Sequence, residues 1–101
     1  RNGVGSIIRV EHGSVGPGEP FQGEYDLVVA NIIARVLSEL STSLVKAVRP
    51  GGTLILGGII DIKEDLVQDA YAGLGMVLVR RDTREDWVVL VYAKPSTTQP
   101  G

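Results

Sequence analysis

The sequence contains no cysteine, no long uninterrupted apolar run and no excess of basic residues. The lack of cysteine excludes disulfides and thiolate metal sites, and we expect no metal centre and a reducing compartment. No apolar run approaches the length of a membrane span, and nothing near Arg1 resembles a signal peptide. We therefore expect a cytoplasmic protein without membrane contact.

The charge balance also excludes a class of partner. Ten Lys and Arg residues against twelve Asp and Glu residues give a net charge of -2, and the basic residues are spread along the chain. This gives no reason to expect charge-driven binding of nucleic acid. The phosphate-binding patterns G-x-x-x-x-G-K and strand-G-x-G-x-x-G-helix are missing as well.

What the chain does contain is centred on the stretch from Asp26 to Asn31. Its 101 residues, 44% of them hydrophobic, suit one globular domain or part of one. A continuous apolar run predicts a strand buried on both faces, as in a parallel sheet covered by helices. Asn31 would then lie at the carboxyl end of an interior strand, where α/β sheets bind ligands. The alternative is that Asn31 only caps the next helix or forms a turn.

The remaining pattern alternates strands and helices. Asp61 and Glu64 have the spacing of a capping box at the start of the second helix. Gly57 and Gly58 allow a close approach, either by a neighbouring element, which we favour, or by a ligand. The short charged turn after residue 81 makes the last two strands antiparallel. The predicted strands are 6–12, 53–58, 76–81 and 87–93, the helices are 34–48 and 61–74, and a loop rich in Gly and Pro is 13–20.

This order of elements resembles the second half of a class I methyltransferase domain, the Rossmann-like fold that binds S-adenosylmethionine. Three segments resemble the ribosomal protein L11 methyltransferase family in particular, and the resemblance extends from about Gly3 to Lys94. The A-N-I-x-A pattern is moderately specific, whereas P-G-G before a strand is common among methyltransferases. The segments are DLVVANIIARVL from Asp26, LVKAVRPGGTLIL from Leu44 and EDWV from Glu85.

The resemblance implies an α/β fold: a Rossmann-like class I methyltransferase sheet that lacks its first two strands and ends in an antiparallel hairpin. Residues 1–94 would form the carboxyl-terminal part of a catalytic domain, and residues 95–101 a disordered tail. The implied function is part of an S-adenosylmethionine-dependent protein methyltransferase. It would methylate amines, either a lysine side chain or an α-amine, of a ribosomal large-subunit protein.

The resemblance also implies roles for individual residues. Asn31 would contact the cofactor or the target nitrogen, since an uncharged amide suits holding a neutral amine in line with the methyl group. Ile32 and Ile33 would form an apolar wall beside the substrate amine. Gly13 and Ser14 would contact the adenine of the cofactor. A lysine amine must lose a proton before attack, and no residue in the chain is an obvious base for that step.

His12 precedes the two predicted adenine contacts. The family pattern gives it a role beside the adenine, and the alternative is a solvated histidine at the end of a strand.

Two parts of the family's cofactor site are missing from this sequence. They are the Gly-rich loop after the first strand and the acidic residue after the second strand, which binds the ribose hydroxyls. We therefore expect an incomplete site and a chain that is inactive alone. Without those strands, the strand at 26–31 has an unpaired edge, which either the first strand of this chain or a second copy, giving a homodimer, would cover. Two alternatives stay open: a non-catalytic α/β interaction module that binds no cofactor, and a methyltransferase of a small molecule.

Overall fold

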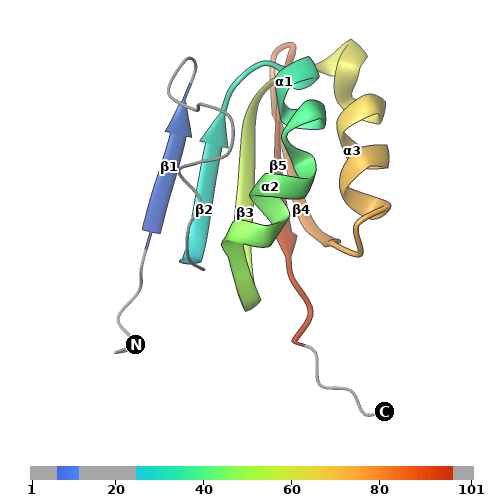
Figure 1. The fold of residues 1–101 in the computed structure, drawn as a ribbon. Coiled ribbons are helices and arrows are strands. Elements are labelled where there is room, and N and C mark those ends of the chain that lie inside the picture. Colours follow the sequence, from blue (N-terminus) through green and yellow to red (C-terminus); the bar gives the residue numbers. More distant parts are fainter. Residues whose placement is uncertain (1–6, 12–24, 97–101) are drawn as a thin grey trace.

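The computed structural model describes residues 7–11 and 25–96, and these form a five-stranded sheet with helices packed against one face (Figure 1). The strand order is β1-β2-β3-β5-β4. Strands β1, β2 and β3 run parallel, whereas β5 is antiparallel to both β3 and β4. The strands are β1 (Ile7–Glu11), β2 (Tyr25–Asn31), β3 (Val48–Ile60), β4 (Val77–Arg84) and β5 (Trp87–Ala93), and the helices are α1 (Ala34–Glu39), α2 (Ser41–Ala47), the 3₁₀ helix η1 (Asp61–Lys63) and α3 (Glu64–Ala72).

The mixed sheet with its terminal antiparallel hairpin confirms the predicted fold class. The first strand, β1, pairs with β2 in register from Ile7 opposite Leu27 to Glu11 opposite Asn31. This confirms one of the two expected ways of covering the edge of β2. Pairing between two copies of the chain stays a prediction.

The burial of β2 corrects the expectation of a strand covered on both faces. Val28 and Ala30 are fully buried against the helices, whereas Leu27 and Val29 on the other face are only half-buried. The reason is that all the helices in the described part of the chain lie on one face of the sheet (Figure 1). None of these helices is long and apolar enough to cross a membrane.

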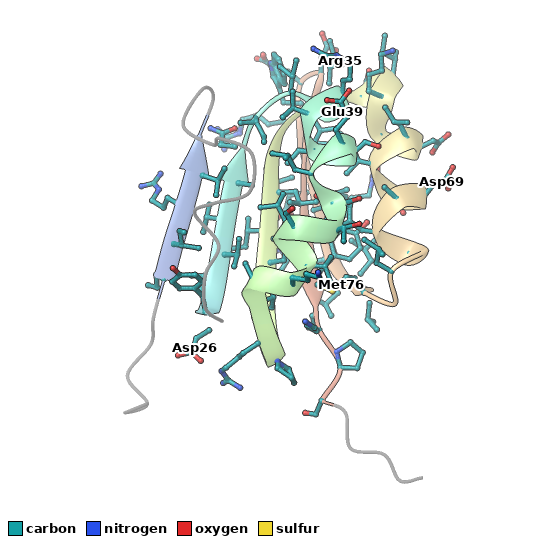
Figure 2. All side chains as sticks on the ribbon, in the orientation of Figure 1. Asp26, Arg35, Glu39, Asp69 and Met76 are labelled. Atoms are coloured by element: carbon teal, nitrogen blue, oxygen red, sulfur yellow. The ribbon has the colours of Figure 1, made fainter. Side chains whose placement is uncertain are left out.

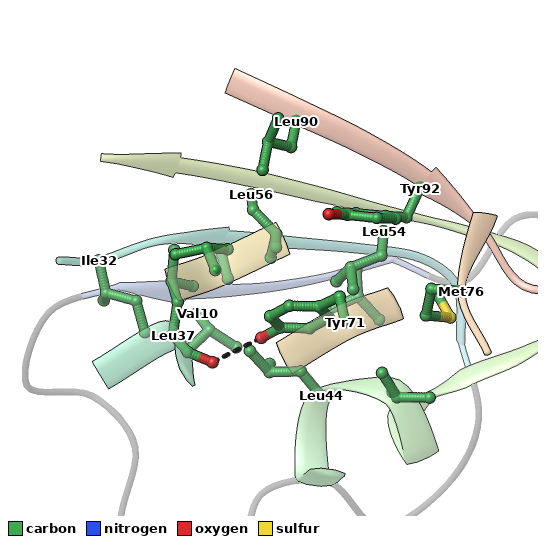
Figure 3. Close-up of a cluster of buried hydrophobic side chains, with 14 of the residues drawn as sticks. Val10, Ile32, Leu37, Leu44, Leu54, Leu56, Tyr71, Met76, Leu90 and Tyr92 are labelled. Carbon is green, nitrogen blue, oxygen red and sulfur yellow. Dashed lines mark hydrogen bonds between the residues drawn. The ribbon is translucent and has the colours of Figure 1, made fainter. Parts of the chain in front are cut away.

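Two tyrosines join the helix layer to the sheet (Figure 3). The ring of Tyr71 on α3 stacks on that of Tyr92 on β5, with 5.6 Å between their centroids. The buried Tyr71 hydroxyl donates a hydrogen bond of 2.7 Å to the carbonyl oxygen of Leu37. Burial, followed by the charge of Glu64, raises the pKa of Tyr92 to about 12.

The predicted helix 34–48 is divided at Leu40, whose backbone angles are φ -95° and ψ 9°. Leu40 serves both halves, because its N–H donates to Val36 and its carbonyl oxygen accepts from Leu44. The second half is followed directly by β3, which starts five residues before the predicted strand. The added residues pair on both sides. Val48 pairs with Tyr25 of β2. On the other side, Gly51 donates to the carbonyl oxygen of Lys94, just after β5, and the Lys94 N–H donates to the carbonyl oxygen of Gly52.

The capping-box prediction is wrong. Helix α3 begins at Glu64 after the 3₁₀ turn, without a side-chain cap. The Glu64 carboxylate instead accepts hydrogen bonds from Arg81 on β4, one of them 2.8 Å long, and from Gln68. A charged partner from another element therefore outcompetes the local backbone for this side chain.

The ends of the chain lie largely outside the description. Of the predicted tail 95–101, the structure describes Pro95 and Ser96 alone, and disorder there stays a prediction.

The turn of the last hairpin is shorter than predicted, since β4 continues to Arg84 and leaves Glu85 and Asp86 between the strands.

Candidate functional site

Asn31 is the last residue of β2, at the carboxyl ends of the parallel strands. It lies opposite Gly57 of β3, and its side chain is exposed. This confirms the predicted position at the end of an interior parallel strand. The residue before α1 is Ile33, and the helix has no side-chain cap, so Asn31 does not serve as its N-cap.

Two glycines on β3 make room for the Asn31 side chain. A Cβ atom on Gly58 would lie 2.9 Å from Asn31 Oδ1 and equally close to the carbonyl oxygen of Ile32. Gly58 also has a φ of +77°, which L side chains rarely adopt. The favoured interpretation, that these glycines admit a neighbouring element, is confirmed.

The two isoleucines after Asn31 have different surroundings. Ile32 is 5% exposed and belongs to the core, whereas Ile33 is 50% exposed. Ile33 lines a cavity at this end of the sheet, so it is the member of the pair that can meet a ligand directly. The predicted adenine contacts Gly13 and Ser14, together with His12, lie outside the described residues.

The cavity has a volume of about 260 Å³ and lies where the end of β3, the start of α1, the 3₁₀ turn and the start of β5 come together. Arg35 marks this end of the molecule in Figure 2. Hydrogen bonding between the Asp61 N–H and the Asp86 carbonyl oxygen joins η1 to the hairpin turn. Lining the cavity are Ile33, Ala34, Arg35, Gly58, Ile60, Lys63 and Trp87.

Sequence reasoning missed most of this lining. Trp87 and Ile60 face each other across the β3–β5 ladder, although they are far apart in sequence. The available signal for the cavity was the single tryptophan beside the hairpin turn. The apolar pattern of a strand does not reveal which other strand it will pair with, so the contact with Ile60 could not be predicted. Lys63 had no signal, since residues 61–63 were predicted as the start of the second helix and form a separate 3₁₀ turn instead.

The charged side chains that line the cavity are cationic. Arg35 forms an ion pair of 3.2 Å with Glu39, one turn along α1, and both side chains are well exposed. In the described residues, Lys63 has no recorded ion pair, and no acidic side chain lines the cavity. The polar atoms of the lining side chains, on Arg35, Lys63 and Trp87, are all hydrogen-bond donors.

The family model of ribosomal protein L11 methyltransferase (PrmA) matches residues 1–95 of this chain. The chain belongs to the ribosomal protein L11 methyltransferase family.

Curated members of this methyltransferase family match nearly the whole chain. The ribosomal protein L11 methyltransferase of Chloroflexus aurantiacus is 35% identical over an alignment of 117 positions, gaps included. The alignment covers 94% of this chain and 36% of that protein. The one of Syntrophotalea carbinolica is 40% identical over 94 residues, which cover 93% of this chain and 30% of that protein. This chain therefore spans about a third of the length of these relatives.

Solved structures support the same family. The ribosomal protein L11 methylase of Lactobacillus delbrueckii subsp. bulgaricus superimposes with a TM-score of 0.70 at 26% identity, over 73% of this chain and 38% of that one. A methyltransferase from Pyrococcus furiosus superimposes with a TM-score of 0.59 at 15% identity, over 73% of this chain and 43% of that one, which shows the fold alone. The chain thus has the Rossmann-like methyltransferase fold.

Methyltransferases of this class use S-adenosylmethionine. The volume and the polar lining of the cavity can be compared with what this cofactor needs. Pockets that enclose ligands of drug size have volumes of about 300–1,000 Å³, whereas this cavity measures about 260 Å³. None of its lining side chains offers an acceptor for ribose hydroxyls. This cavity by itself is therefore not a complete site for the cofactor.

Proposed function

We propose that this chain is the carboxyl-terminal part of the catalytic domain of an S-adenosylmethionine-dependent methyltransferase, and that the enzyme methylates amines of ribosomal protein L11. The acceptor is a lysine side chain or an α-amine. Membership of the family supports the proposal. The observation that carries it is the exposed amide of Asn31, presented at the carboxyl end of an interior parallel strand.

Asn31 positions the acceptor amine. Its uncharged amide hydrogen-bonds a neutral amine without favouring the protonated form, which has no lone pair for attack. Gly57 and Gly58 leave room for this amide beside β3, where it can align the amine with the methyl group. The bound cofactor supplies an electrophilic methyl group, and the chain supplies the alignment.

Ile33 forms the apolar wall next to this position, and Ile32 supports it from the core. An apolar wall excludes water and so favours the neutral amine over the ammonium. We further propose that Gly13 and Ser14, outside the described residues, contact the adenine.

A chimera tests the catalytic role. The segment of the Chloroflexus aurantiacus enzyme that aligns with this chain is replaced by this chain, and methyl transfer to ribosomal protein L11 is measured. We expect the chimera to be active, and Asn31→Ala to reduce its rate on the order of 100-fold because the amine loses its alignment.

Asp69→Ala is the matched control, since Asp69 is exposed on α3 (Figure 2) and does not line the cavity. It should leave the rate unchanged. A folded chimera in which Asn31→Ala and Asp69→Ala have equal rates would refute the role of Asn31.

Calorimetry on the isolated chain tests the predicted incompleteness of the cofactor site. We expect no binding of S-adenosylmethionine in the micromolar range, and clear binding would contradict the expectation.

A pull-down with and without the cofactor addresses the interaction-module alternative, because a partner retained equally in both would favour a module that works without cofactor.

A further inference from the structure

The cavity beside Asn31 has the size of a site for one side chain. An apolar cavity of about 150 Å³ holds a benzene molecule, whereas pockets for drug-sized ligands start near 300 Å³. At about 260 Å³, this cavity lies between these limits. It is large enough for a branched aliphatic side chain and lies below the range of pockets that enclose drug-sized ligands.

Its walls are apolar and accessible. Ile33, Ile60 and Trp87 line the cavity and are 50%, 37% and 51% exposed. Large apolar side chains gathered around a hollow mark a binding site more often than a plain surface. An aliphatic group placed there would remove all three from water.

The polar groups of the lining select the charge of the occupant. Arg35 and Lys63 are cations, and the indole N–H of Trp87 is a donor. Glu39 balances part of the Arg35 charge, and the exposed Asp61 and Asp86 lie close by without lining the cavity. An ammonium group would find no side-chain acceptor here and would be repelled, whereas a carboxylate would find donors.

We propose that this cavity binds one aliphatic side chain of the protein segment that carries the acceptor amine, and that Lys63 and Arg35 favour a carboxylate next to that side chain. The identity of the segment as substrate rests on the proposed function, whereas the binding preference does not. Gly58 lines the cavity, and a Cβ atom added to it would lie only 2.9 Å from Asn31 Oδ1. The occupant is therefore a close neighbour of the methylated residue, and the target amine itself stays outside, at Asn31.

The single tryptophan of the chain reports directly on this site, because Trp87 forms part of its wall. Its fluorescence is followed while the full chain is titrated with three probes that share the leucine side chain. N-acetylleucine carries a carboxylate, N-acetylleucinamide is neutral, and leucinamide is cationic below about pH 7. We expect N-acetylleucine to give a saturable blue shift with an affinity roughly tenfold above that of leucinamide.

Variants locate the effect. Lys63→Gln should remove most of the preference for the anionic probe while the chain stays folded, since Lys63 is exposed. Ile33→Ala should weaken all three probes. Val79→Ala is the control, because Val79 is similarly exposed on β4 but does not line the cavity. It should change nothing.

Two results would overturn the proposal: no saturable shift with any probe, or binding of leucinamide that equals or exceeds that of N-acetylleucine. Neither depends on catalysis. If the chimera methylates ribosomal protein L11 but the probes do not bind, the cavity proposal alone fails. If the probes bind as expected and the chimera is inactive, the failure lies with the proposed function.

Discussion

The two ends of the parallel strands are built differently. At the amino ends, Asp26 of β2 forms an ion pair with Arg49 of β3. The Lys94 ammonium donates hydrogen bonds of 2.9 and 2.8 Å to the carbonyl oxygens of Val45 and Val48, where α2 ends. Charged side chains here connect β2, β3, α2 and the end of β5 to one another, and their hydrogen bonds are made within the chain.

At the carboxyl ends the polar groups face outward. Asn31 is exposed, and the Arg35–Glu39 pair lies on the surface, where such a pair contributes about 0–1 kcal/mol. The cavity lies at this end, which Arg35 marks in Figure 2. One end of the sheet therefore stabilises the fold, and the other keeps its polar groups available for a ligand. Substitutions at the amino ends should change stability alone, and substitutions at the carboxyl ends should change binding, except where the backbone itself is constrained.

Gly58 is that exception, and Gly58→Ala should have the largest effect. A methyl group there meets Asn31 Oδ1 and the Ile32 carbonyl oxygen at 2.9 Å, and the backbone keeps a φ of +77°. We expect the free energy of unfolding to fall by about 3 kcal/mol or more, measured by urea denaturation.

Gly75→Ala is the matched control. Its φ is +84°, but a Cβ there meets nothing within 4 Å. The cost should be that of the backbone conformation alone, about 1–2 kcal/mol. Equal losses in the two variants would show that close packing between β3 and Asn31 is unimportant.

Lys94→Met tests the amino ends and should have the next largest effect. Loss of the ammonium removes two charge-assisted hydrogen bonds to carbonyl oxygens, and we expect a loss of about 1–3 kcal/mol in the free energy of unfolding. The affinity of the cavity for N-acetylleucine should not change.

Lys46→Met serves as the control, because Lys46 is exposed in the last turn of α2 and has no recorded hydrogen bond among the described residues. Its effect should stay within about 0.5 kcal/mol. If Lys94→Met altered probe binding as strongly as stability, the division between the two ends would be wrong.

Glu64→Gln should have the smallest effect, and one that depends on pH. Hydrogen bonds from Arg81 hold the pKa of Glu64 below its ordinary 4.5, against burial, which raises it. The carboxylate is thus favoured in the folded state, so its contribution is complete above pH 4.5 and is lost as the pH falls through the lowered pKa. The variant should be about 1 kcal/mol less stable at pH 7, and the difference should shrink towards pH 3.

Glu39→Gln is the comparison for this pH effect, since Glu39 belongs to an exposed pair. Urea midpoints at several pH values for both variants give the test. The lowered pKa of Glu64 would be contradicted if the loss of stability in Glu64→Gln, relative to the unmodified chain, stayed constant down to pH 3.

Sequence patterns gave a good account of the elements and of the position of Asn31. The strand ending at Asn31, the helical stripe after it and the final hairpin all follow from local apolar periodicity, which is set by the geometry of each element. The division of the first helix at Leu40 did not follow, because the apolar stripe continues through it. The cavity did not follow either, since Trp87 meets Ile60 through a pairing of distant strands.

By itself the sequence determined the order and type of the elements, because hydrophobic period, proline and glycine act on neighbouring residues. It also placed an amide at the carboxyl end of an interior strand. Only the tertiary structure decided that Glu64 binds Arg81 instead of capping its helix, that β1 lies beside β2, and that Ile33 faces a cavity while Ile32 enters the core. These outcomes depend on which distant groups come within bonding distance, and local pattern carries no information about that.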